Sequence, residues 1–144
     1  MVVWRLARHR YAALTGVGGV VTEGRWHHAG RPIVYATENL ALAVLEVRVR
    51  AKEPPLDYVA TEIEIPDAGI LKPAGLPLDW KDRVEWTRAA GDAWLESAAS
   101  IALAVPSAVV AGCWNYLLNP SHRSFDEVIL KRVEPFDFDI RLLH

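Results

Sequence analysis

Residues 56–65 constrain the fold most tightly, because their side chains alternate in polarity with a period of two. Positions 58, 60, 62 and 64 hold Tyr, Ala, Glu and Glu, whereas positions 59, 61, 63 and 65 hold Val, Thr, Ile and Ile. This period is typical of a strand that buries one face and exposes the other. The segment therefore predicts a half-buried strand, and hence a sheet.

Other segments add both strands and helices to this sheet. Short apolar runs predict further strands at residues 2–6, 32–36, 101–105, 108–110 and 128–133. Helical spacing of apolar residues predicts helices at residues 40–47 and 84–99, and Thr37-Glu-Asn39 offers an N-cap for the first helix. The strands lie in both halves of the chain without the regular strand–helix alternation of a parallel sheet. We therefore expect an α+β fold.

Three further segments are assigned to neither a helix nor a strand. Residues 14–19 form a glycine-rich loop, residues 115–120 lead into a polar loop, and residues 135–139 form a terminal extension. The glycine-rich loop lacks the G-x-G-x-x-G spacing and the strand-to-helix context of a dinucleotide-binding turn. A Rossmann-type site is therefore not expected.

The length and composition of the chain fit one soluble domain. Its 144 residues, of which 51% are hydrophobic and 24% charged, suit a single domain, which we place at residues 1–144. No apolar run approaches the roughly 18 residues of a membrane span. The charges scattered through residues 1–14 argue against a secretory signal. We expect a cytoplasmic protein without a membrane partner.

Charge, cysteine and tryptophan content narrow the possible ligands. The net charge is −2 and the basic residues form no stripe, so we expect no direct binding of nucleic acid. One cysteine excludes an internal disulfide and a cysteine-based metal site. The six tryptophans are expected mainly in the core and in interfaces, with one or two as candidates to line a pocket for a flat ring.

Two catalytic interpretations have little support in the sequence. His27 and His28 are adjacent, next to glycines, and lack the i, i+4 spacing of helical metal ligands, so we expect no metal site. Ser107 lacks the G-x-S-x-G surroundings of a hydrolase nucleophile. Its ordinary role would be a hydrogen bond to the local backbone after Pro106.

Arg25, Tyr35 and Glu46 form a more informative set. Glu46 closes an apolar run, where a carboxylate is costly unless it has a partner. Arg25 carries a planar fork that can bind two oxygens of a phosphate or carboxylate at once. From the spacing alone, the three residues could form a pocket or could be an ordinary loop cation, phenol and helix carboxylate.

Six short segments, taken in order, resemble the RES-domain family. They are GVGG at residues 16–19, GRW at 24–26, GRPIVYA at 30–36, LAVLE at 42–46, VPSA at 105–108 and NYLLNPSH at 115–122. The family is named for an Arg, a Glu and a Ser, which here correspond to Arg25, Glu46 and Ser107. The resemblance spans nearly the whole chain. It departs from the expected pattern at His27 and His28, where a small polar residue such as Asn would be usual after Gly-Arg-Trp.

The resemblance implies a fold, a substrate and a partner. The fold would be ADP-ribosyltransferase-like, with mixed or antiparallel sheets and flanking helices. The protein would be a bacterial toxin that uses NAD as a substrate, with no cofactor, and that an Xre-like antitoxin silences by covering the active site. A homodimer within the toxin–antitoxin complex is also compatible with the family.

The resemblance also implies roles for individual residues. Arg25 would hold the pyrophosphate of NAD, Tyr35 would contact a ring, and Glu46 would hold the ribose and stabilise its developing charge. Ser107 would orient a ribose hydroxyl or the nicotinamide amide. Asn119 and His122 would complete the rim of the pocket and contribute to NAD binding.

Several functional alternatives remain open at this point. Water, inorganic phosphate or a protein side chain could accept the ADP-ribose, giving hydrolysis, phosphorolysis or protein modification. A second class of function is a binding module that kept the fold and lost turnover. The intact set of Arg25, Tyr35 and Glu46 argues against the second class.

Overall fold

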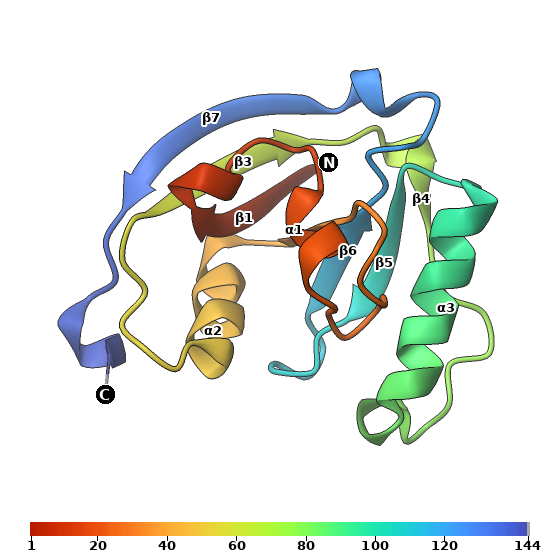
Figure 1. Ribbon diagram of the computed structural model, residues 1–144, viewed down its shortest axis with the longest axis horizontal. Coiled ribbons are helices and arrows are strands. Elements are labelled where there is room, and N and C mark those ends of the chain that lie inside the picture. Colours follow the sequence, from red (N-terminus) through yellow and green to blue (C-terminus); the bar gives the residue numbers. More distant parts are fainter. Residues whose placement is uncertain (144) are drawn as a thin grey trace.

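Seven strands and three α-helices make up the described chain, residues 1–143 of a computed structural model (Figure 1). The strands are β1 Val2–Arg8, β2 Val34–Thr37, β3 Tyr58–Glu64, β4 Ile70–Leu71, β5 Ala102–Pro106, β6 Trp114–Leu118 and β7 Ile129–Phe136. The helices are α1 Val17–Val21, α2 Leu40–Arg50 and α3 Val84–Ser97. Short 3-10 turns occupy His9–Tyr11, Asp67–Gly69, Trp80–Asp82, Phe125–Glu127 and Ile140–Leu143.

The strands form one mixed sheet in the order β4-β5-β6-β2-β1-β3-β7. Every neighbouring pair is antiparallel except β4 and β5, which are parallel. The sheet consists of two blocks, β4-β5-β6-β2 and β1-β3-β7, which meet at one paired position within residues 1–143, Trp4 with Thr37. The predicted α+β fold with a mixed, mainly antiparallel sheet and flanking helices is confirmed.

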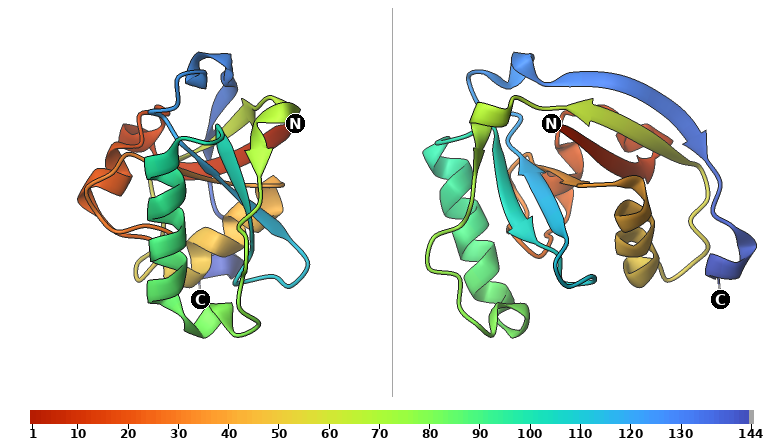
Figure 2. Two further views of the ribbon diagram at one scale, coloured as in Figure 1. Left: turned by 90° about the vertical axis from the view of Figure 1, so that its right-hand side faces the viewer. Right: turned by 180° about the vertical axis from the view of Figure 1, so that it is seen from behind.

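The two longer helices cover different blocks of the sheet. Helix α3 packs through Trp94 and Leu95 against Leu103 and Leu117 of the four-stranded block. Helix α2 packs through Ala43 and Val47 against β1 and β3. Figure 2 shows α3 and α2 well apart, each beside its own block. Among the described residues, no helix has the length and apolar character needed to cross a membrane.

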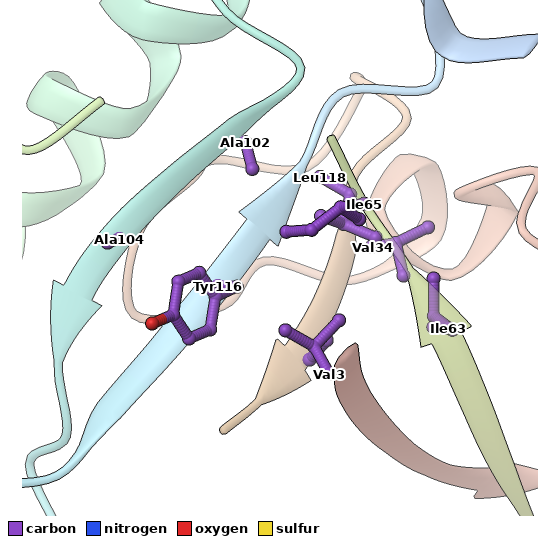
Figure 3. Packing of buried hydrophobic residues seen from close by; sticks show 9 residues of the cluster. Val3, Val34, Ile63, Ile65, Ala102, Ala104, Tyr116 and Leu118 are labelled. Carbon is purple, nitrogen blue, oxygen red and sulfur yellow. The ribbon is translucent and has the colours of Figure 1, made fainter. Parts of the chain in front are cut away.

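The main hydrophobic cluster fills the junction between the two blocks. Its members come from both of them, and Figure 3 shows the cluster at close range: Val3, Val34, Ala36, Ile63, Ile65, Ala102, Ala104, Tyr116 and Leu118. Side-chain packing therefore joins the blocks where backbone pairing is reduced to one position. This arrangement leaves space for a cavity beside the junction.

Most predicted elements are present, and the start of α2 follows the predicted capping chemistry. The side chain of Asn39 accepts a hydrogen bond of 2.8 Å from the backbone N–H of Leu42, which satisfies one of the free donors of the first helical turn. The strands near residues 2–6, 32–36, 56–65, 101–105 and 128–133 and the helix near residues 84–99 are also confirmed.

The structure differs from the interpretation of the sequence in four local segments. Residues 108–110 form no strand, because the Ser107 hydroxyl accepts the backbone N–H groups of Val109 and Val110 and turns the chain. The second half of the glycine-rich loop expected at residues 14–19 belongs to helix α1. The segment at 115–120 is largely strand β6, and the supposed extension at residues 135–139 begins inside β7.

Candidate active site

A cavity of about 430 Å³ lies beside the junction of the two sheet blocks. Its walls come from β1, β2, α2, the first turns of α3, residues 23–26 and the residues flanking Ser107. This volume is within the range of roughly 300–1,000 Å³ that is usual for small-molecule sites. Arg25, Tyr35 and Glu46 all line this cavity, so the fold brings these three predicted residues together.

Glu46 is held in the cavity through one of its two carboxylate oxygens. The Ser107 hydroxyl and the Asn115 amide N–H both donate to Glu46 Oε1, each over 2.8 Å. Within residues 1–143, Oε2 accepts no hydrogen bond. The two donors therefore fix the orientation of the carboxylate and leave Oε2 available to a ligand.

Ser107 donates a hydrogen bond to Glu46 and is almost fully buried, with 2% of its surface exposed. Its hydroxyl oxygen accepts two backbone N–H groups at 3.0 Å, and its proton is donated to Glu46. The predicted direct contact between this hydroxyl and a substrate group is therefore not what the arrangement provides. Ser107 positions the carboxylate.

Asn115 is a site residue that the sequence analysis missed. It lies in β6, and its side chain reaches the cavity beside Glu46. Its Oδ1 is buried and has no hydrogen-bond partner in the described chain. An unsatisfied buried acceptor of this kind costs the fold free energy. The motif Asn115–Pro120 was read as the approach to a loop, which concealed the inward position of its first residue.

Tyr35 ties the cavity wall to the segment that carries Arg25. Its hydroxyl accepts the backbone N–H of Trp26 over 3.1 Å and lies 2.7 Å from His27 Nδ1. Because His27 Nε2 contacts the carbonyl of Gly19, a neutral ring donates from Nε2 and accepts the phenolic proton at Nδ1. Burial raises the pKa of Tyr35 well above its usual range, so the phenol stays neutral.

Arg25 lines the cavity from the segment of residues 23–26. Its guanidinium donates to the backbone carbonyl of Lys81 over 2.9 Å and lies 5.8 Å from the ring centre of Trp80. No carboxylate in the part of the chain that the structure describes forms a salt bridge with it. Trp4 and Trp26 also line the cavity, and Trp26 is at the same time a buried member of the cluster that packs against α3, as expected for most tryptophans.

Helix α3 holds the backbone of the Arg25 segment in place. The Thr87 hydroxyl donates to the carbonyl of Arg25 over 2.6 Å, and Arg88 Nε donates to the carbonyl of Gly24 over 2.8 Å. Gly91 lets the segment approach the helix, since a Cβ atom there would lie 1.6 Å from the carbonyl oxygen of Trp26.

His28 adds a charged contact between the same segment and α3. Its Nδ1 lies 2.5 Å from a carboxylate oxygen of Asp92, and its Nε2 lies 3.0 Å from one of Glu85. These hydrogen bonds, first to Asp92 and then to Glu85, raise the pKa of His28. The two histidines that depart from the family pattern therefore have different partners: His27 contacts Tyr35, and His28 contacts helix α3.

Asn119 and His122 lie outside the lining of the cavity, so the expected position of these residues at the rim is wrong. Asn119 follows the far end of β6 from Asn115 and donates to the carbonyl of Leu95 over 3.3 Å. His122 Nδ1 accepts the backbone N–H of Ser124 over 3.0 Å. Both side chains stabilise the turns after β6.

Comparison with known proteins gives consistent results. Residues 2–139 match the RES domain. The chain is 39% identical to "Toxin Res" of Pseudomonas putida, with 99% of each protein covered, and 34% identical to "Prs ADP-ribosylating toxin" of a Sphingobium species, with 97% and 95% covered. Its fold matches a crystal structure of the M. tuberculosis MbcT–MbcA toxin–antitoxin complex with a TM-score of 0.73 at 16% identity, over 94% of this chain and 84% of the other. On the extent of these matches, the chain belongs to the RES domain family.

Proposed function

We propose that this protein is the toxin of a toxin–antitoxin pair and that it consumes NAD by cleaving the bond between nicotinamide and its ribose. The observation that carries the proposal is the carboxylate of Glu46, which lines a ligand-sized cavity and is fixed at Oε1 by Ser107 and Asn115. The names of two relatives, "Toxin Res" and "Prs ADP-ribosylating toxin", support it.

The proposed reaction needs a fixed negative charge more than an acid. When the C–N bond breaks, its electron pair leaves with the nicotinamide nitrogen, which becomes neutral, and positive charge develops on the ribose. Glu46 Oε2 would stabilise this charge or hold a ribose hydroxyl close to it. Because Ser107 and Asn115 already orient the carboxylate, little reorganisation is required as the charge forms.

The other walls of the cavity suit the remaining parts of NAD. Arg25 has a guanidinium that no carboxylate of residues 1–143 neutralises, and it would bind the pyrophosphate. Trp4 and Tyr35 provide aromatic surface for the rings.

After the cleavage, the ADP-ribose can go to one of two kinds of acceptor. In the first, water or inorganic phosphate attacks the ribose and gives up a proton, which yields ADP-ribose or its 1-phosphate. In the second, a protein side chain is the acceptor. The name of the Sphingobium relative favours the second outcome for that protein. The alternative to any cleavage is a catalytically silent binding module.

An antitoxin partner follows from the same proposal, because a chain that consumes NAD would damage its own cell. The solved structure with the same fold is a toxin–antitoxin complex. We propose an Xre-like antitoxin that covers the cavity, with a toxin homodimer as one form of the assembly. The occluded surface would include the cavity mouth near Arg25 and Arg50.

The decisive experiment is incubation of the purified protein with NAD, with and without inorganic phosphate, followed by mass analysis of the products. Release of nicotinamide with ADP-ribose indicates hydrolysis, and release with a phosphorylated ADP-ribose indicates phosphorolysis. A mass shift on a protein in a cell extract indicates transfer. Unchanged NAD under all three conditions would favour the silent module. In cells, expression should lower NAD and arrest growth, and co-expression of the antitoxin should restore both.

A further inference from the structure

His27 is a buried side chain that lies next to a wall of the cavity without lining it. It belongs to the turn of residues 24–27, and 1% of its surface is exposed. Its ring centre lies 5.6 Å from that of Tyr35, which does line the cavity. The hydrogen bonds of a buried polar ring show what it holds in place.

The two contacts of the His27 ring determine which nitrogen carries the proton. Nε2 lies 3.0 Å from the backbone carbonyl oxygen of Gly19, which can only accept, so Nε2 must be a donor. In the neutral ring, Nδ1 then has no proton and accepts one from the Tyr35 hydroxyl, 2.7 Å away. The hydrogen bond between Tyr35 and His27 therefore runs from the phenol to the imidazole.

The turn of residues 24–27 closes around the hydroxyl oxygen of Tyr35. The backbone N–H of Trp26 donates to this oxygen over 3.1 Å, and the N–H of Gly24 donates to the carbonyl of His27 over 3.2 Å. A Cβ atom at Gly24 would lie 2.5 Å from the Tyr35 oxygen and 3.2 Å from His27 Nδ1. The absence of a side chain at position 24 therefore permits the contact between Tyr35 and His27.

These contacts join two parts of the cavity wall. Tyr35 lines the cavity from β2, and the turn that encloses its hydroxyl carries Arg25, which also lines the cavity. Because the phenol already donates its single proton to His27, it has none to offer a ligand. Tyr35 can thus present its ring or accept a hydrogen bond, but it cannot act as an acid while His27 holds this proton.

We infer that His27 is a positioning residue of the cavity: by accepting the proton of Tyr35, it fixes the phenol ring and the turn that carries Arg25 for the binding of NAD. The identity of the ligand rests on the proposed function. His27 does not line the cavity, so it acts through Tyr35 and not by contact with the ligand.

Two substitutions separate the two contacts of His27. The amide oxygen of Asn lies the same number of bonds from Cβ as Nδ1, and the amide nitrogen of Gln lies the same number of bonds from Cβ as Nε2. His27→Asn therefore keeps an acceptor for Tyr35 and loses the contact with Gly19, whereas His27→Gln does the reverse. The control is His9→Gln, at an exposed position outside the cavity. Thermal unfolding checks that each variant is folded.

Nicotinamide release from NAD compares the variants. His27→Gln should lower the rate about tenfold, since a buried hydroxyl loses its partner, and His27→Asn should keep most of the parental rate. In the Tyr35→Phe background, His27→Gln should cause no further loss, because the hydroxyl through which His27 acts is gone. Equal losses in His27→Asn and His27→Gln, or the same loss with and without the Tyr35 hydroxyl, would overturn the inference.

A second measurement needs no turnover. Nitrogen-15 NMR of the histidine rings in the full parental chain reports which ring nitrogen of each of the five histidines is protonated. The His27 signals are those that are missing in either His27 variant. We expect a neutral ring with its proton on Nε2. A proton on Nδ1, or on both nitrogens, would leave the phenolic proton free and contradict the inference.

The failure of this inference is distinguishable from failure of the proposed function. In a parental chain that releases nicotinamide, equal rates in the two His27 variants would remove the positioning role and keep the function. If the parental chain releases none, the function is removed, and calorimetric titration of NAD decides the role of His27. Weaker binding by His27→Gln than by His27→Asn would keep that role, and equal affinities or no binding would remove it.

Discussion

The Ser107 hydroxyl lies 2.8 Å from Glu46 Oε1, although 61 positions separate the two residues in the chain. Two of the three residues that name the family therefore form one hydrogen-bonded unit, which Asn115 completes from β6. Residues that act as a unit give non-additive losses when they are mutated together. Combined substitutions of Glu46, Ser107 and Asn115 are therefore expected to cost less than the sum of their single effects.

Glu46→Gln should nearly abolish NAD consumption and leave the fold intact. The amide oxygen of Gln can still accept the hydrogen bonds from Ser107 and Asn115, but the negative charge is lost. Loss of one preorganised electrostatic contact costs on the order of 100- to 1,000-fold in rate. Nicotinamide release measures the rate, and Glu127→Gln, an exposed change outside the cavity, is the control. A parental rate in Glu46→Gln would remove this residue from the mechanism.

Ser107→Ala should lower kcat more than it raises KM, because the hydroxyl positions Glu46 and does not line the cavity. Loss of a hydrogen bond to a charged group corresponds to about 10- to 100-fold. Stability should fall by about 1–3 kcal/mol, since the N–H groups of Val109 and Val110 lose their acceptor. Asn115→Ala should lower kcat similarly. A change confined to KM would instead place Ser107 against the substrate.

Arg25→Lys should weaken the binding of NAD even though the charge is kept, because an ammonium group cannot make a two-pronged contact with phosphate. The expected loss is about tenfold or more. Calorimetric titration of NAD into the Glu46→Gln background, with and without Arg25→Lys, measures binding apart from turnover. Arg123→Lys is the control. Equal affinities would assign the pyrophosphate contact to other residues.

His28 should stabilise the fold in a pH-dependent manner. Its pKa in the folded chain is raised above 6.5 by hydrogen bonds to Asp92 and Glu85. A raised folded-state pKa gives stability that is complete below the unfolded value and is lost as the pH rises through the folded value. The difference in unfolding free energy between the parental chain and His28→Gln should therefore be larger at pH 6 than at pH 9.

Chemical denaturation at several pH values measures this difference. The pKa of Glu85 is lowered, first by its hydrogen bond with His28 and then by Arg88, so Glu85 stays ionised throughout this range. His9→Gln is the control, because the exposed His9 side chain makes no salt bridge in the described chain. A difference that is constant with pH would mean that the charge of His28 does not contribute.

Gly91→Ala should destabilise the protein and displace the Arg25 segment. The added methyl group would overlap the carbonyl oxygen of Trp26, which is backbone and cannot rotate away. Overpacking of this kind costs about 1–3 kcal/mol or more. Gly18→Ala in α1 meets no atom within 4 Å and should instead be neutral or stabilising. Thermal unfolding of both variants and NAD binding by Gly91→Ala provide the comparison.

The sequence predicts the elements whose pattern is set by local chemistry. The period of two at residues 56–65 and the cap at Asn39 both correspond to features of the structure. Strand β6 was missed because both of its faces are buried, Tyr116 and Leu118 toward one cluster and Leu117 toward another, so no polar alternation marks it.

The candidate site was predictable only in part, because some of its residues are brought together by contacts between distant parts of the chain. Arg25, Tyr35 and Glu46 lie in short motifs and could be identified from the sequence, and all three line the cavity. The contribution of Asn115 depends on the pairing of β6 with β2 and β5. Contacts between residues that are far apart in the chain produce no motif of fixed spacing in the sequence.

The junction of the two sheet blocks affects how the shape of the cavity can change over evolutionary time. A hydrogen-bonded ladder holds strands about 4.8 Å apart whatever their side chains are, whereas a packed contact varies with the volume of the residues in it. At this junction the ladder is reduced to Trp4 and Thr37, and the contact is made by buried residues such as Val3 and Val34. Substitutions of buried residues that no substrate contacts can therefore change the width of the cavity.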